Sequence, residues 1–134
     1  MTNFMKTNQP QNNTENTFEE FVFDVISADL DNQINKECGQ IIQKGIFPTN
    51  MNRGIRVYIY SGDHLPIHFH VKSPQRYLDA KFQLNPLGVM ENKTSIRIDK
   101  DEGFIVKYFT KNSHLLDEIR NKFMELNPNL NYEN

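Results

Sequence analysis

The feature that most constrains the fold is a series of short strand-like segments between residues 55 and 98. In the first of them, 55–60, Ile and Val alternate with Arg and Tyr, which is the two-residue repeat of a strand with two different faces. Turns containing Gly and Pro separate the segments, so an antiparallel meander of three to four short strands is expected. The later strand-like segments are 68–72, 78–84 and a weaker one at 94–98.

The segment before these strands has helical spacing. Thr17 and Glu20 fit a capping box, and apolar residues recur three and four positions apart until Gly45. This pattern predicts a helical extension over residues 17–45. A strand remains the alternative for residues 21–26, because three of these six residues are β-branched.

The C-terminal part also has helical spacing. One apolar stripe covers residues 104–109 and another covers 115–126, with Asn112 or Ser113 as the cap of the second helix. Together these patterns predict an α+β fold, in which an N-terminal helix and C-terminal helices pack on one face of the meander.

A length of 134 residues corresponds to one domain. We interpret residues 1–16 as a disordered polar tail and 17–127 as a single α+β domain, with 128–134 as a C-terminal tail. Within that domain, 17–45 is the helical extension and 46–127 is the core.

Two further features bear on location. Cys38 is the one cysteine in the sequence, which excludes an internal disulfide and suits a reducing compartment. No apolar run approaches the roughly 20 residues of a membrane span. We therefore expect a cytoplasmic protein with no membrane partner.

The net charge of -2 is a cancellation between segments. Residues 1–50 carry an excess of acidic groups, 51–100 an excess of basic groups, and 101–134 a smaller acidic excess. Three of the four histidines lie in the basic part. A cationic module of this kind suggests an anionic ligand.

The chemistry of the chain is concentrated between Asp63 and His70. On a strand, His68 and His70 project from the same face, and His64 lies in the turn that leads into this strand. We predict that these three histidines and Asp63 form the catalytic or binding site, with Asp63 orienting an imidazole.

Three interpretations of this cluster remain open. Two imidazoles can act as acid and base at a phosphate, or hold it as cations. Neutral imidazoles with a carboxylate can instead bind a divalent metal ion, with His64, His68 and His70 as ligands. The third interpretation is structural: the histidines pack beside tyrosines across the strands, and Asp63 caps the turn. We expect no cofactor, and the metal ion is the alternative.

Basic and aromatic residues around the cluster are candidates for ligand binding. Arginines and lysines would attract an anion, and tyrosines on a strand could stack on bases. The residues of this group are Arg56, Tyr58, Tyr60, Lys72, Arg76 and Lys81.

The sequence YIYSGDHLPIHFHV resembles a small bacterial family catalogued as domain of unknown function 4160, whose pattern is Asp-His-x-Pro-x-His-Phe-His-Val after an Ile/Tyr-rich strand. The similarity continues through residues 79–86 and covers roughly 46–130. Phe123 departs from the family, in which Trp is frequent at that place, and the helix before Gly45 looks like an extension. The positions that match the pattern are Ile59, Tyr60, Asp63, His64, Pro66, His68, Phe69, His70 and Val71.

This resemblance implies an α+β fold and an origin in bacteria or their mobile elements, often in toxin–antitoxin gene pairs. The leading hypothesis is therefore a toxin–antitoxin or phage-conflict module whose histidine cluster binds or acts on a phosphate-bearing ligand, RNA or a nucleotide. If the protein is an enzyme, we expect histidine-dependent hydrolysis or transfer at a phosphodiester. The alternatives are a non-enzymatic module that binds the protein of a paired gene, and a protein that binds a divalent metal. The sequence predicts no oligomeric state.

Overall fold

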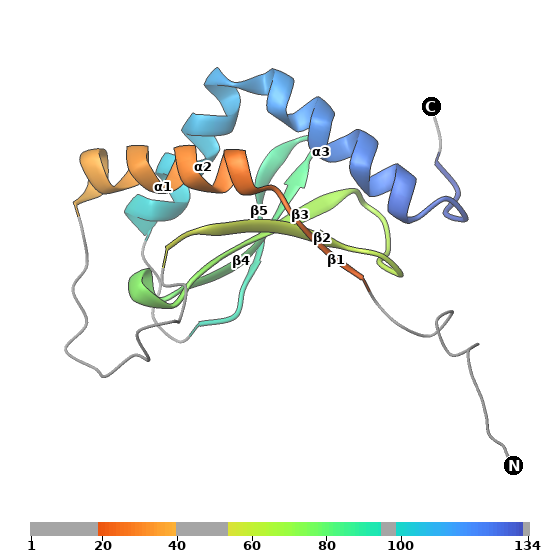
Figure 1. Ribbon diagram of the computed structural model, residues 1–134, viewed down its shortest axis with the longest axis horizontal. Helices are drawn as coiled ribbons and strands as arrows, with labels where there is room; N and C mark the ends of the chain where they lie inside the picture. The colour runs from red at the N-terminus through yellow and green to blue at the C-terminus, as the bar shows by residue number, and fades with distance from the viewer. Residues whose placement is uncertain (1–18, 40–53, 95–98, 133–134) are drawn as a thin grey trace, which may run out of the picture.

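The computed structural model describes residues 19–39, 54–94 and 99–132. These residues form an antiparallel five-stranded sheet in the order β1-β2-β3-β4-β5, with three α-helices on the same side of it (Figure 1). The α+β class, the meander and the terminal helices are therefore confirmed. The elements are β1 (Glu20–Val22), α1 (Asp24–Cys38), β2 (Arg56–Tyr60), β3 (His68–Ser73), the 3₁₀ helix η2 (Pro74–Arg76), β4 (Leu78–Leu84), β5 (Leu87–Asn92), α2 (Asp99–Lys111) and α3 (Ser113–Leu126).

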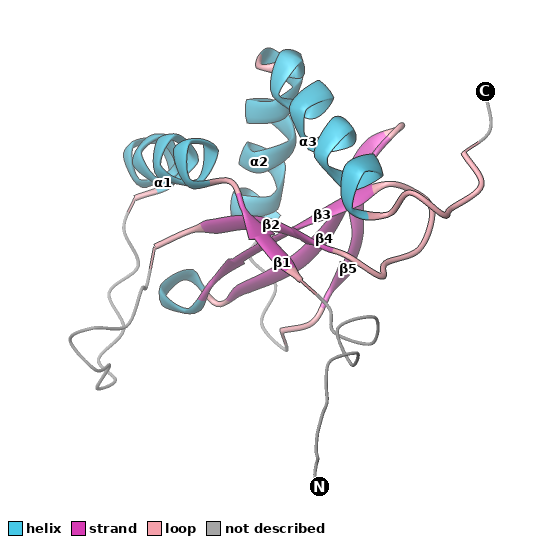
Figure 2. Ribbon diagram, turned by 45° about the vertical axis from the view of Figure 1, so that its right-hand side comes forward, coloured by secondary structure: helices cyan, strands magenta, loops and turns pink. Residues whose placement is uncertain are grey.

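The central strand β3 separates the two faces of the sheet by its alternation. Phe69 is fully buried and its ring lies 4.9 Å from the ring of Phe109 in α2, on the face that the helices cover (Figure 2). His68 and His70, two positions apart, leave the strand on the other face. Opposite His70, the antiparallel register places Tyr58 of β2 and Lys81 of β4.

The N-terminal segment differs from the helix predicted over 17–45. Residues Glu20–Val22 form an edge strand that pairs with Tyr58–Tyr60, and α1 begins at Asp24 and ends at Cys38. The strand alternative for part of this segment was thus correct, while a helix start at a Thr17–Glu20 capping box was wrong. The physical reason lies in β2, whose outer edge would otherwise expose unpaired backbone groups. Gly45 lies outside the described residues.

The remainder of the same β2 edge is covered by side chains of α1. The Ile55 N–H donates to Oδ1 of Asp31 over 3.0 Å, and the Val57 N–H donates to Oγ of Ser27 over 2.8 Å. The polar groups of α1 therefore replace the strand that β1 is too short to supply.

Of two further sequence predictions, the position of the last strand differs from the structure and the restart of the C-terminal helix agrees with it. The connection between β4 and β5 is a tight turn at Asn85–Pro86. The strand β5 begins at Leu87, earlier in the chain than the weak strand predicted at 94–98. Residues 95–98 are outside the described part of the chain. The helical restart after Asn112 is confirmed, since α3 begins at Ser113.

Arg76 is one of the most buried side chains of the described residues and not a surface cation. Its Nε and Nη2 each donate to the Asp101 carboxylate at 2.8 Å, and Nη1 donates to Oδ1 of Asn35 and to the Gly39 carbonyl. This network joins η2 to the end of α1 and the start of α2. The expectation that Arg76 steers an anion is therefore not supported by its position, because its charge is already paired inside the protein.

Among the helices that the structure describes, none is both long and apolar enough to cross a membrane.

We predict that Asp101→Asn lowers the free energy of unfolding by about 3 kcal/mol or more, because it leaves a buried guanidinium without its counterion. The measurement is urea unfolding followed by circular dichroism. Asp117→Asn is the matched control, since it breaks the exposed Arg120–Asp117 pair and should cost less than about 1 kcal/mol. Equal losses in the two variants would contradict a dominant role for the buried pair.

Candidate functional site

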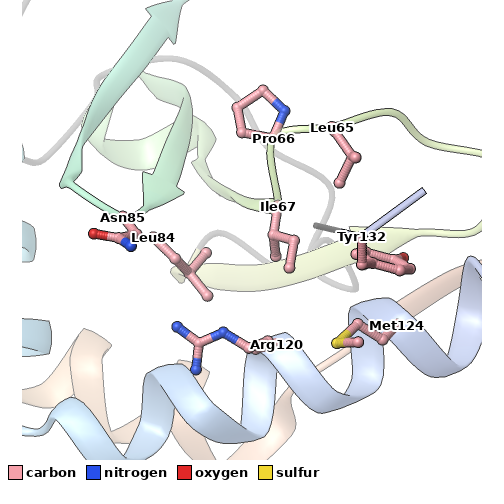
Figure 3. A pocket seen from close by; sticks show the side chains of 8 residues that line it. All are labelled: Leu65, Pro66, Ile67, Leu84, Asn85, Arg120, Met124 and Tyr132. Carbon is pink, nitrogen blue, oxygen red and sulfur yellow. The ribbon is translucent and has the colours of Figure 1, made fainter. Parts of the chain in front are cut away.

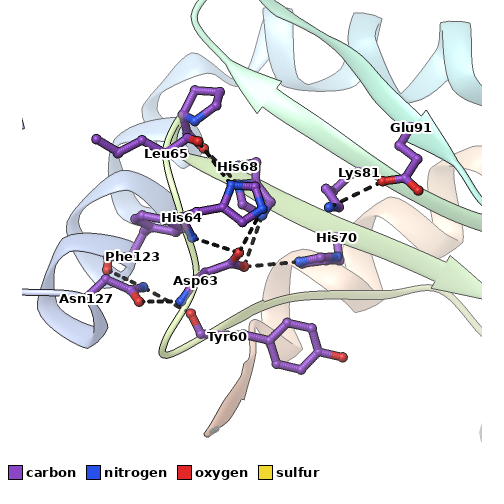
Figure 4. Close-up of polar contacts among 11 residues, drawn as sticks. Tyr60, Asp63, His64, Leu65, His68, His70, Lys81, Glu91, Phe123 and Asn127 are labelled. Atoms are coloured by element: carbon purple, nitrogen blue, oxygen red, sulfur yellow. Dashed lines mark hydrogen bonds and ion pairs between the residues drawn. The ribbon is translucent and has the colours of Figure 1, made fainter. Parts of the chain in front are cut away.

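Asp63 is the point on which the three histidines of the motif converge (Figure 4). Nε2 of His68 lies 3.0 Å from Oδ2 of Asp63, and Nε2 of His70 lies 3.5 Å from the same oxygen. Nε2 of His64 lies 3.7 Å from Oδ1. The four residues predicted from the sequence are therefore brought together in one cluster at the β2–β3 connection.

The local backbone explains how Asp63 faces the strand that follows. The turn after β2 contains Gly62 in the left-handed region, with φ of 67°. Oδ1 of Asp63 then accepts a hydrogen bond of 2.9 Å from the His64 N–H, so the side chain folds back over its own loop. From this position the carboxylate meets the imidazoles of β3.

In His64 and His68, a hydrogen bond made by Nδ1 determines the tautomer of the ring, and therefore which nitrogen carries the lone pair. Nδ1 of His68 lies 2.8 Å from the Pro66 carbonyl oxygen, and Nδ1 of His64 lies 3.0 Å from the Leu65 carbonyl oxygen. A carbonyl only accepts, so each Nδ1 carries a proton that it donates. In the neutral form of each ring, the lone pair is therefore on Nε2, the nitrogen that points toward Asp63.

The ring nitrogens of β3 are buried without a satisfied hydrogen bond. The side chains of His68 and His70 are 0% and 10% exposed, and neither Nε2 makes a well-aligned hydrogen bond to any described residue. A buried polar atom without a partner is costly, so each Nε2 needs either a proton that pairs it with the Asp63 carboxylate or a ligand or ion that it contacts. The His64 side chain is 63% exposed, so it forms the outer edge of the cluster.

The charge state of Asp63 follows from two opposing effects. Burial raises the pKa of the Asp63 carboxyl, but the His68 and His70 ring nitrogens and the His64 backbone N–H outweigh burial and hold that pKa well below its usual range. The carboxylate is therefore ionised at neutral pH. A largely buried carboxylate requires a positive counterpart, which here is either a protonated imidazole or a bound cation.

Asn127, at the end of α3, holds the cluster in place and was not predicted from the sequence. Its Oδ1 accepts a 2.8 Å hydrogen bond from the Asp63 N–H, and its Nδ2 donates to the carbonyls of Tyr60 and Phe123. The Tyr132 hydroxyl donates to the Asn127 carbonyl over 2.7 Å. A residue interpreted as the end of the domain thus fixes the loop that carries Asp63, and no local sequence pattern signals a contact over 64 positions.

The two tyrosines of β2 enclose His70 and offer no free stacking platform. The Tyr58 ring is stacked on the His70 ring with centroids 5.1 Å apart, and the Tyr60 ring meets His70 edge-on at 5.0 Å. The Arg56 guanidinium covers Tyr58 at 4.6 Å. Burial raises the pKa of the Tyr58 hydroxyl, which therefore stays protonated. These rings hold the His70 imidazole.

The predicted cations around the cluster have acidic neighbours. Arg56 lies 3.4 Å from a carboxylate oxygen of Glu20, and Lys81 lies 3.3 Å from one of Glu91. Lys72 is opposite Asp79 in the β3–β4 register. These three cations therefore have acidic groups nearby, although the net positive charge of residues 51–100 remains.

We predict that Asn127→Ala lowers the free energy of unfolding by about 2 kcal/mol, because it leaves buried backbone groups of the Asp63 loop without partners. Amide hydrogen exchange at Asp63 should become faster in this variant. Asn129→Ala, at an exposed position two residues later, is the control and should change neither quantity. An unchanged exchange rate at Asp63 in Asn127→Ala would contradict the anchoring role.

Residues 54–113 match a family model described as Domain of unknown function (DUF4160). Searches of curated proteins and of solved structures gave no match to this chain. The matched range contains β2 to α2, including all four residues of the cluster, and ends where α3 begins. This match confirms, over residues 54–113, the resemblance of the histidine pattern to that family of domains of unknown function.

Proposed function

We propose that Asp63, His64 and His68 bind a divalent transition metal ion, with zinc as the best fit to the ligand types. The supporting observation is the orientation of the two imidazoles, whose Nδ1–H groups donate to backbone carbonyls while their Nε2 atoms face the Asp63 carboxylate. Metal-bound histidines characteristically donate the second ring N–H to a carbonyl or carboxylate. In neutral rings these two lone pairs would repel the carboxylate, and a cation bound among them would remove that repulsion.

The spacing of the ligand atoms suits such an ion. With bonds of about 2.0–2.1 Å, the ligands of a tetrahedral zinc ion lie about 3.3 Å apart. The Nε2 atoms of His68 and His64 lie 3.0 and 3.7 Å from the nearest Asp63 oxygens. One ligand atom from each of the three residues can be chosen so that all lie within 4.8 Å of one another. Small side-chain movements would therefore bring the three ligand atoms to bonding distance from one ion.

His70 takes a different position in this proposal. Its Nε2 faces Asp63 at 3.5 Å, but its ring is held by Tyr58 and Tyr60, and no carbonyl contact like those of His64 and His68 fixes its tautomer. We therefore assign His70 a supporting role, in which it contacts Asp63 but does not bind the metal ion. Three protein ligands leave a coordination position for water or a substrate, as in catalytic zinc sites.

Direct binding of phosphate by these imidazoles is less well supported. The ionised Asp63 carboxylate occupies the point where the ring nitrogens meet, and it would repel an anion. The nearest arginine and lysine side chains lie beside carboxylates of their own. RNA or a nucleotide as ligand, phosphodiester chemistry and a toxin–antitoxin role stay predictions that a metal-loaded protein could still fulfil.

The first test is titration of untagged, chelator-treated protein with Co²⁺, followed by its visible absorption spectrum. We expect binding of one ion, and at least about tenfold weaker binding in Asp63→Asn and His68→Gln, since each removes a ligand. His70→Gln should weaken binding less. His114→Gln, which alters an exposed histidine of α3, is the matched control and should bind as the unaltered protein does.

Thermal unfolding separates this function from the structural interpretation of the cluster. A metal ion that binds the folded state raises the melting temperature of the unaltered protein. That rise should vanish in Asp63→Asn. If Co²⁺ and Zn²⁺ produce neither a saturable spectrum nor a rise in melting temperature, while His68→Gln destabilises the metal-free protein, the histidines are structural.

A second prediction concerns pH. Because its surroundings hold the pKa of Asp63 well below the usual range, this carboxylate remains ionised as the pH falls from about 8 to about 5. Protons still compete with the metal for the imidazoles, so Co²⁺ affinity should decrease with falling pH. Calorimetry in buffers of different ionisation enthalpy should show proton release on binding, and less release in His64→Gln. Proton release that His64→Gln and His68→Gln leave unchanged would exclude the two imidazoles as ligands.

A further inference from the structure

A pocket of about 710 Å³ is lined in part by the segment that connects Asp63 to β3 (Figure 3). Leu65, Pro66 and Ile67 form one wall, Leu84 at the end of β4 contributes to it, and α3 provides Arg120 and Met124. This volume lies in the range of small-molecule sites, which are about 300–1,000 Å³.

Most described residues of the pocket lining are apolar, and the polar ones are Asn85, Tyr132 and the cation Arg120. Leu65 and Met124 are 38% and 37% exposed, so their apolar side chains are available to a ligand. The Arg120 side chain extends from α3 toward Leu84 and is 39% exposed. Its Nη1 contacts Asp117 at 2.8 Å, and no other polar partner of Arg120 occurs among the described residues. The guanidinium therefore retains donors for a second acceptor.

The same short segment serves both the pocket and the histidine cluster. The side chains of Leu65 and Pro66 line the pocket, whereas their backbone carbonyls accept the Nδ1–H groups of His64 and His68. A molecule in the pocket would thus press on the residues that orient both imidazoles.

We propose that this pocket binds a small molecule with an apolar body and a single carboxylate. The apolar walls would enclose the body, and Arg120 would pair with the carboxylate, for which a guanidinium provides parallel donors. A single charge fits better than the double charge of a phosphate monoester, because among the described residues of the pocket lining the one cation is a guanidinium already shared with Asp117. Occupancy would be linked to metal binding through Leu65 and Pro66, a linkage that rests on the proposed metal function.

The test uses octanoate as the probe and the full chain without metal, followed by two-dimensional NMR. We expect saturable shifts at Ile67, Leu84 and Met124. Arg120→Gln should weaken octanoate binding by about tenfold through loss of a charge-assisted contact, and should leave binding of octan-1-ol unchanged. Met124→Trp fills the pocket and should weaken binding of both probes.

Arg56→Gln is the matched control for Arg120→Gln. Arg56 is also paired with a carboxylate and is 36% exposed, but it lies outside this pocket. Shifts that do not saturate, or equal octanoate affinity in Arg120→Gln and Arg56→Gln, would overturn the proposal.

The linkage between the pocket and the metal site is tested by a separate measurement. Saturating octanoate should change the Co²⁺ affinity, and Co²⁺ should change the octanoate affinity by the same factor. Unchanged affinities would overturn the linkage alone. A protein that binds octanoate but no Co²⁺ would overturn the metal function and leave the pocket intact.

Discussion

The alternation of side chains along β3 is the constraint on which the rest of the structure depends. Because neighbouring residues project to opposite faces, Phe69 and Val71 are buried in the core while His68 and His70 face Asp63. A shift of one residue in the pairing of β3 with β4 would move Phe69 and Val71 out of the hydrophobic core and put polar side chains of β3 in their place. The hydrophobic core thus fixes the register, and the register places two of the three histidines.

Much of the fold could be predicted because its signals are local. The segment 78–84 coincides with β4, and the restart at Asn112 coincides with the boundary between α2 and α3. The strand β1 could not be identified with the same security, since its three residues become a strand only where the edge of β2 needs a partner. Arg76 shows the same limit: in the sequence it is one cation of a basic segment, and its partner Asp101 lies 25 positions away.

For the site, the sequence indicated which four residues come together but not the charges at their centre. The i, i+2 spacing of His68 and His70 correctly indicated a shared face. Whether these rings serve an anion or a cation depends on the atoms that meet at the centre, and there the structure places the Asp63 carboxylate. The carbonyls that receive the Nδ1–H groups belong to Leu65 and Pro66, residues whose side chains suggested nothing polar.

The contact between Asn127 and the Asp63 loop joins a part of the chain inside the matched family range to a part outside it. The four residues of the cluster lie within the matched family range of 54–113, whereas Asn127, Phe123 and the α3 wall of the pocket lie after it. The residues that make up the cluster and the residue that holds its loop in place thus belong to different parts of the chain. Transferring residues 54–113 into another chain would transfer the cluster without the Asn127 side chain that holds the Asp63 loop in place.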